Sequence, residues 1–152
     1  FLETPFNFTS SRFRLQGYPQ ALASAGIAFR PEYHVQGEHG RAQARQMAHH
    51  LLKLPERPTA IFAASDTQAF GALEAARDLK IQVPEELSII GYDDIEVAEY
   101  LGLTTIRQLL YESGIRGVHL LLERLENPQA EPVEEILPTE LIVRRTTAPP
   151  VN

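Results

Sequence analysis

Two adjacent carboxylates, Asp93 and Asp94, follow an apolar stretch, "LSIIGY" (87–92), that has the character of a buried strand. Carboxylates in this position can cap a helix, form a catalytic pair, accept a phosphoryl group or line a ligand pocket. Adjacent residues at a strand end point in opposite directions, whereas a catalytic pair must converge on one bond. Glu96 lies three residues after Asp93, which is the spacing of a capping box. We therefore expect one aspartate to cap the next helix and the other to accept hydrogen bonds from a ligand.

A second polar pair, Ser65 and Asp66, follows another predicted strand, "PTAIFAA" (58–64), and precedes a helical pattern that starts near Thr67. Both residue types are preferred at helix N-caps because a side-chain oxygen can accept from a free backbone amide of the first turn. One of the two is expected to cap the helix, which leaves the other to face a pocket at the end of the sheet.

Among the five histidines, His39 is the one that follows a predicted strand, "YHVQ" (33–36). Ligands of open parallel sheets bind beyond the carboxyl ends of the strands, so His39 is placed where it could meet a ligand. No His-x-x-x-His pair occurs, which favours surface or packing roles for the other histidines. The sequence therefore predicts no metal site.

Motifs of several common chemistries are absent from the sequence. It contains no Gly-x-Gly-x-x-Gly, P-loop or Gly-x-Ser-x-Gly motif and no cysteine. A phosphate-accepting aspartate would need a lysine at a neighbouring strand end, but the only lysines, Lys53 and Lys80, lie near helix ends. These observations favour a binding protein over an enzyme and predict no cofactor.

The charge and hydropathy of the chain exclude two further classes of partner for this segment. Its net charge of -6 argues against direct binding of nucleic acid, which needs a basic surface. No apolar run reaches the roughly 18 residues of a membrane span. The chain begins with Phe1 rather than methionine, so we interpret it as part of a longer protein.

Strand and helix patterns alternate along the chain. Strands are expected at 33–36, 58–66, 87–94 and 103–108, and amphipathic helices at 10–27, 40–54, 67–80 and 111–127. Short connections between such elements are typical of right-handed βαβ units, and the continuous apolar character of two strands fits burial on both faces. The fold class is therefore α/β, a parallel sheet with helices on both faces. Residues 132–150 are expected to form two short strands that are interrupted at Pro138.

The segment "RPTAIFAASDTQAFGALEAARDLKIQVPEELSIIGYDDIEVAEYLGLTTIRQ" (57–108) closely resembles the core of the LacI/GalR family of bacterial transcriptional regulators. The segments "SSRFRLQGYPQALASAGI", "LLERLENP" and "ILPTELIVRRTTAPP" resemble its flanking parts, so the resemblance spans nearly the whole chain. It implies a three-layer periplasmic-binding-protein-like fold of type I, in which two α/β subdomains enclose a ligand cleft.

The resemblance also implies a division of the chain and a set of partners. Residues 8–107 would form the C-terminal effector-binding subdomain, 108–137 would belong to the N-subdomain, and 138–152 would return to the first subdomain. Proteins of this kind are cytoplasmic homodimers that bind operator DNA through an N-terminal helix-turn-helix, a part absent from this chain. A sugar or nucleoside-like effector controls that binding allosterically. A periplasmic sugar-binding receptor of a transporter, which has the same fold, is the alternative.

Individual positions match the family's functional residues. The resemblance implies that Arg14 and Asp93 bind the effector, with Ser65 in place of a frequent asparagine and His39 in place of a frequent aromatic residue. Gln108 corresponds to a residue near the hinge that reaches the pocket in some members. Asp66 and Asp94 would then be helix caps. Phe70, Leu73 and Tyr100 lie where the family's dimer interface falls.

The predicted helix 111–126 carries an unusually strong apolar stripe, made of Ile115, Val118, Leu121, Leu122 and Leu125. If this helix belongs to the other subdomain, most of the sheet against which it packs lies outside the chain. We therefore expect the rest of a longer protein, or another copy, to cover the stripe.

Overall fold

The computed structural model describes residues 1–3 and 9–150 and, before Arg12, the side chains of Phe1 and Leu2 alone. The predicted subdomain boundary at residue 8 lies outside the described residues. The helices are α1 (Thr9–Ser24), the 3-10 turn η1 (Pro31–Tyr33), α2 (Arg41–Leu52), α3 (Asp66–Asp78), α4 (Glu96–Leu101) and α5 (Leu110–Glu126). The strands are β1 (Leu2–Glu3), β2 (Val35–Gln36), β3 (Ala60–Phe62), β4 (Ser88–Asp93), β5 (Thr104–Gln108) and β6 (Thr139–Ile142).

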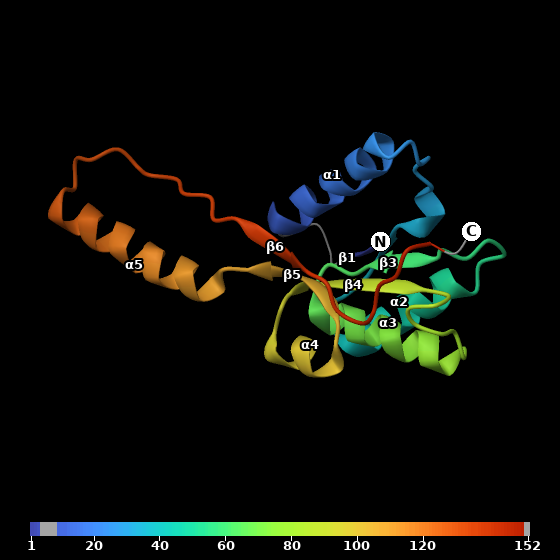
Figure 1. Cartoon of the computed structure of the whole chain (residues 1–152). Helices are drawn as coiled ribbons and strands as arrows, with labels where there is room; N and C mark the ends of the chain where they lie inside the picture. The colour runs from blue at the N-terminus through green and yellow to red at the C-terminus, as the bar shows by residue number, and fades with distance from the viewer. Residues whose placement is uncertain (4–8, 151–152) are drawn as a thin grey trace.

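The strands form a mostly parallel sheet in which β3, β4 and β5 are parallel neighbours and β6 is antiparallel to β5. The short strands β1 and β2 pair in parallel, and a bridge between Leu2 and Ala63 joins them to β3. Helix α1 covers one face of the sheet, and α2 and α3 cover the other (Figure 1). The predicted α/β fold with helices on both faces is confirmed.

The main core lies between the sheet and the pair α2–α3. Leu51 of α2, Ile61 of β3 and Ile89 of β4 are each at most 1% exposed, and Leu87 and Leu103 are fully buried beside them. Alanines on the inner face of α3 allow this helix to lie close to both α2 and the sheet. This packing fixes the strands whose carboxyl ends carry the predicted site residues.

The two predicted strands around Pro138 are not both present. Residues 131–138 form no strand, and only β6 follows them. The stretch before Pro138 is mostly exposed and contains three glutamates, and the described residues place no strand beside it. A strand without a hydrogen-bonded neighbour is not stable, so the apolar residues there were a misleading signal.

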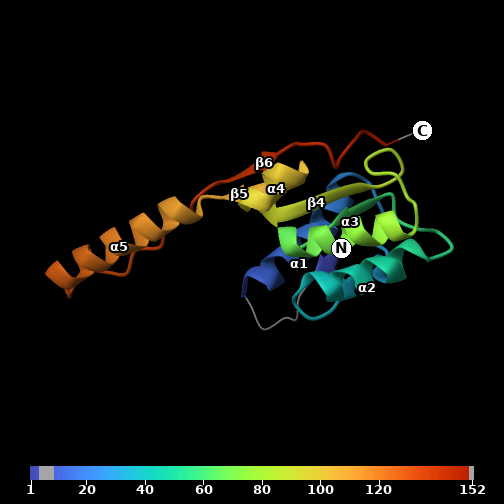
Figure 2. The same cartoon turned by 90° about the horizontal axis from the view of Figure 1, so that it is seen from below.

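Helix α5 projects away from the rest of the molecule in both views (Figures 1 and 2). It has no buried residue, and the exposure of its apolar stripe ranges from 42% at Ile115 to 67% at Leu125. An amphipathic helix of this kind requires an apolar partner surface. The described residues do not supply it.

Gly91 provides a test of how closely α3 approaches β4. A Cβ atom at this position would collide with Oδ1 of Asp66 and would lie 2.9 Å from Cδ2 of Leu103. Gly91→Ala should therefore lower the free energy of unfolding by about 1–3 kcal/mol, the usual cost of overpacking. Urea denaturation measures this change.

Gly114→Ala in α5 is the matched control. Apart from its chain neighbours and the backbone of α5 itself, no atom of the described residues lies within 4 Å of the added methyl group. It should leave the stability unchanged or raise it by up to about 1 kcal/mol, since alanine favours a helix. Equal stability of the two variants would contradict the close packing at Gly91.

Candidate functional site

Parallel strands bring distant polar residues to one edge of the sheet. Asp93 is the last residue of β4, and Gln108 is the last residue of the adjacent strand β5. The side-chain amide of Gln108 donates a hydrogen bond to Oδ1 of Asp93 over 2.7 Å. Two of the predicted site residues are thus in direct contact.

The Asp93 carboxylate is partly withdrawn from solvent and has no ion-pair partner within 4.0 Å among the described residues. Burial raises its pKa above the usual value. The hydrogen bond from Gln108 and the charge of Arg14 act in the opposite direction, and the negative charge of Asp66 adds to the increase. The backbone at Asp93 has a φ of 119°, so the strand ends in a sharp change of direction. The result is a carboxylate that retains acceptor capacity for a ligand.

Arg14 lies on α1, which covers the face of the sheet opposite to α2 and α3, and its side chain reaches the same edge of the sheet (Figure 1). Its Nη1 donates to the carbonyl oxygen of Ala64 over 2.7 Å, and its guanidinium carbon lies 3.9 Å from the centre of the Tyr92 ring. A cation above an aromatic face is attracted to it, so these two contacts fix the orientation of the guanidinium group. Tyr92 is a site residue that the sequence reasoning missed, although it directly precedes Asp93.

Ser65 is the N-cap of α3. Its Oγ accepts a hydrogen bond from the backbone amide of Gln68 over 3.3 Å. The cap therefore belongs to Ser65 and not to Asp66. Because the hydroxyl accepts from the amide, its own proton is available for donation. Ser65 directly follows Ala64, the residue that holds Arg14.

His39 lies exposed in the loop between β2 and α2, next to Gly40, the N-cap of α2. This loop also follows a strand of the parallel sheet. The structure does not test the role of His39 in ligand binding, which stays a prediction.

Asp66, expected to be a helix cap, is instead a fully buried acceptor. Its Oδ2 accepts from the backbone amide of Ile95 over 2.9 Å, and its Oδ1 accepts from the Thr105 hydroxyl over 2.5 Å. Burial raises the pKa of Asp66, and these hydrogen bonds partly offset the increase. Asp66 thereby ties the beginning of α3 to the turn after β4 and to β5.

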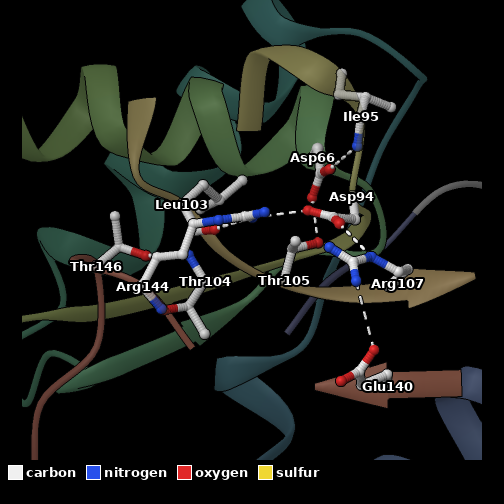
Figure 3. A network of polar contacts seen from close by, with 10 residues as sticks. All are labelled: Asp66, Asp94, Ile95, Leu103, Thr104, Thr105, Arg107, Glu140, Arg144 and Thr146. Atoms are coloured by element: carbon white, nitrogen blue, oxygen red, sulfur yellow. Dashed lines mark hydrogen bonds and ion pairs between the residues drawn. The ribbon is translucent and has the colours of Figure 1, made fainter. Parts of the chain in front are cut away.

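Asp94, the other expected cap, is held by two arginines. Its Oδ2 pairs with Nε of Arg107 and its Oδ1 with Nη1 of Arg144, both at 2.7 Å (Figure 3). Burial acts to raise the pKa of this carboxyl, but the hydrogen bonds and charges of Arg144 and Arg107 outweigh it and hold the pKa below its usual value. The capping-box interpretation is also wrong, since Ile95 is the N-cap of α4 and no side chain caps that helix.

The predicted dimer residues lie on the α3–α4 side of the molecule. Phe70 and Leu73 line a groove of about 760 Å³, together with Val97 and Leu101 of α4. Tyr100, also on α4, has 83% of its surface exposed. Charged side chains also line this groove, namely those of Arg41, Glu74, Arg77 and Arg145. A large exposed aromatic residue beside a groove of apolar residues and arginines is typical of a protein interface.

Comparison with known proteins identifies the family of the chain. Residues 1–147 match the family described as periplasmic binding protein-like domain. The chain belongs to this family. Its relatives include the HTH-type transcriptional repressor CytR of Escherichia coli K12, 39% identical over 137 residues, which are 89% of this chain and 40% of CytR. Another is the ribose operon repressor of Haemophilus influenzae, 44% identical over 117 residues, or 76% of this chain and 35% of the repressor.

The solved structures agree with this family assignment. A LacI family transcriptional regulator from Enterococcus faecium with bound ribose has a TM-score of 0.87 and 32% identity, over 97% of this chain and 56% of that one. The resemblance to LacI-family regulators expected from the sequence is confirmed. The chain spans less than half the length of the two curated repressors. In the described residues, no helix has the length and apolar character needed to cross a membrane.

The ion pairs of Asp94 predict a pH dependence of stability. Its folded pKa lies below the reference value of 3.8, so its contribution is fully present above that value and is lost as the pH falls through the folded pKa. Asp94→Asn should lower the free energy of unfolding at pH 7 by about 1–3 kcal/mol, since hydrogen bonds to a charged group are lost. This difference from the wild type should shrink below about pH 4. Urea denaturation from pH 7 to pH 3 measures both effects.

Asp93→Asn is the control, because the pKa of Asp93 is shifted in the opposite direction. A raised folded pKa means that ionisation of Asp93 opposes folding as the pH rises above 3.8. Its replacement by asparagine should therefore leave the stability at pH 7 unchanged or increase it. The same loss of stability in both variants would contradict the different environments of the two aspartates.

Proposed function

We propose that the chain is the effector-sensing and dimerisation part of a LacI-type transcriptional repressor. The convergence of Arg14, Asp93 and Gln108 at the carboxyl ends of the strands carries this proposal. Such an edge is where open α/β folds bind their ligands. The relatives that match the chain are repressors, which favours a regulator over the periplasmic receptor of a transporter.

A small polyhydroxylated effector fits the chemistry of this edge. The Asp93 carboxylate accepts hydrogen bonds from hydroxyl groups, and the guanidinium of Arg14 and the hydroxyl of Ser65 donate them. The ring of Tyr92 fixes the arginine before the ligand arrives, which reduces the entropy lost on binding. A sugar is the class we favour, because one relative is named for the ribose operon and one similar structure contains ribose. His39 would border the same effector.

The regulatory mechanism follows from the same assignment. Residues 108–137 would belong to the second subdomain, so that an effector at this edge would lie in a cleft between the two subdomains. Closure of the cleft would alter the dimer and, through it, a DNA-binding head that contacts the operator. A coupling energy of about 1–3 kcal/mol between effector and operator is typical of such systems.

Arg14→Ala and Asp93→Asn test the effector site. Each removes a charged hydrogen-bonding group, which should lower the affinity for D-ribose or a related sugar by about 10- to 100-fold. The ligand is first chosen by a thermal-shift screen of sugars, because a ligand at 100 times its Kd raises stability by about 2.7 kcal/mol. Titration calorimetry of the full-length protein then measures the affinity.

Arg12→Ala is the matched control. Arg12 lies on the same helix as Arg14 and is exposed. Two residues along a helix correspond to nearly opposite faces, so its removal should leave the affinity unchanged. Wild-type affinity in both Arg14→Ala and Asp93→Asn would remove the proposed site.

The dimer interface can be tested at Tyr100 without disturbing the core, since this side chain is mostly exposed. Tyr100→Arg would place a charge in the centre of the proposed interface and should weaken the dimer at least tenfold. Sedimentation equilibrium measures the dissociation constant. Tyr111→Arg is the control, because Tyr111 is 78% exposed on α5, away from the α3–α4 face. Equal dimer stability in the two variants would place the interface elsewhere.

A further inference from the structure

Two consecutive residues of β5 hold the two consecutive aspartates at the end of β4. Gln108 donates to Asp93, the proposed effector ligand, and Arg107 pairs with Asp94. The two strands are in register at this point, with Asp93 opposite Arg107. Any change in the position of Asp93 relative to β5 must therefore be accommodated by both contacts.

Asp94 also connects to the segment that follows β6. Its second oxygen pairs with Arg144, which lies two residues after the end of β6. Strand β5 leads the chain out to α5, and β6 returns it to the sheet (Figure 1). The carboxylate of Asp94 therefore contacts β5, which leads to α5, and the segment directly after β6, which returns from α5 (Figure 3).

The two arginines are held differently. Arg144 has a side chain only 14% exposed, and its Nη1 also donates to the carbonyl oxygen of Leu103 over 2.9 Å. Its backbone amide donates to the hydroxyl of Thr104, also over 2.9 Å. Arg107 is 42% exposed, and its second contact is a 3.5 Å ion pair with Glu140 of β6, which is itself 67% exposed. Arg144 is thus the more buried partner of Asp94, and Arg107 is the more exposed one.

The position of Asp94 is itself determined by the buried Asp66. Asp66 accepts from the amide of Ile95, the residue after Asp94, and from the hydroxyl of Thr105 on β5. Asp94 has a φ of 54°, in the left-handed region, which aspartate tolerates better than most residues other than glycine. The turn that carries both aspartates is therefore anchored from inside the core.

We propose that Asp94, Arg107 and Arg144 form a latch that couples the effector contact of Asp93 to the two strands leading to and from α5. Asp94 is a positioning residue in this latch and does not touch the effector. The inference rests on the proposed function, because it assumes an effector at Asp93. Binding of the effector shifts the turn after β4, and the pair Asp94–Arg107 transmits this shift to β5 and through Glu140 to β6.

The test measures coupling rather than affinity alone. For the full-length protein, the affinity for a DNA duplex selected from random sequence is measured with and without saturating D-ribose. The ratio of the two affinities is the coupling. Asp94→Asn and Arg107→Gln should each reduce the coupling at least fivefold. The double variant should be no worse than Asp94→Asn alone, because that substitution already removes the contact with Arg107. Arg144→Gln should reduce the thermal stability more than Arg107→Gln does.

Asp78→Asn is the matched control, since it is the same substitution in another two-partner ion pair. Asp78 pairs with Arg45 and His49 on the α2–α3 side of the molecule. It should leave the coupling unchanged. If Asp94→Asn fails to fold, Arg107→Gln carries the test, because its side chain is more exposed.

The outcomes separate the latch from the proposed function. Wild-type coupling in a folded Arg107→Gln or Asp94→Asn variant that still binds ribose overturns the latch and leaves the effector site standing. A wild-type protein whose affinity for the duplex is unaffected by ribose and by the other sugars of the screen overturns the proposed function, and the latch with it. Amide hydrogen exchange of β5 and β6 provides a further test in the absence of effector. We expect faster exchange in Asp94→Asn than in Asp78→Asn, and equal exchange rates in the two variants would contradict the latch.

Discussion

The burial of one carboxylate, that of Asp66, determines the arrangement of the whole functional edge. A buried charge is costly unless hydrogen bonds replace its hydration. The backbone amide of Ile95 and the hydroxyl of Thr105 supply these hydrogen bonds to Asp66. Those donors come from the turn after β4 and from β5. The absence of a side chain at Gly91 allows Asp66 to lie against β4. Helix α3, strand β4 and strand β5 are thereby joined at the point where the proposed ligand binds.

The two aspartates at the end of β4 have different roles. Asp94 forms ion pairs within the protein, and Asp93 is the proposed ligand of the effector. Asp94 has two arginine partners and a lowered pKa, so its acceptor capacity is used within the protein. Asp93 has a raised pKa because of its burial, and it accepts from the neutral amide of Gln108 through Oδ1. Its other oxygen is therefore able to accept hydrogen bonds from hydroxyl groups. The positive φ values at both residues direct the side chains to different surroundings. Strand alternation predicted this separation, whereas the family resemblance assigned Asp94 the wrong task, that of a helix cap.

The sequence predicts the helices and strands that are long and periodic. It does not predict the side-chain roles that contacts with residues distant in the sequence determine. Helices α2, α3 and α5 and strands β3, β4 and β5 follow from apolar spacing, whereas the two-residue β1 carries too little pattern to be recognised. The choice of cap between Ser65 and Asp66 could not be made locally, since Thr105 and Ile95 determine where Asp66 lies. Likewise, the capping-box spacing of Asp93 and Glu96 gives no indication that Arg107 and Arg144 bind Asp94. The family resemblance supplied Arg14, which no spacing rule connects to Asp93.

The position of α5, whose apolar stripe is exposed, bears on the proposed regulatory mechanism. Because no residue of α5 is buried in the described part of the chain, packing against the sheet does not fix the position of this helix. Within the described residues, α5 is joined to the sheet by β5 and β6, which pair from Thr105 with Ile142 to Gln108 with Thr139. A small rotation of β5 and β6 relative to the rest of the sheet produces a large displacement at the far end of α5. The contacts of these two strands include the pairs of Asp94, Arg107 and Glu140, next to the residue that would bind the effector. The geometry therefore places the proposed ligand contact beside the two strands that lead to and from α5.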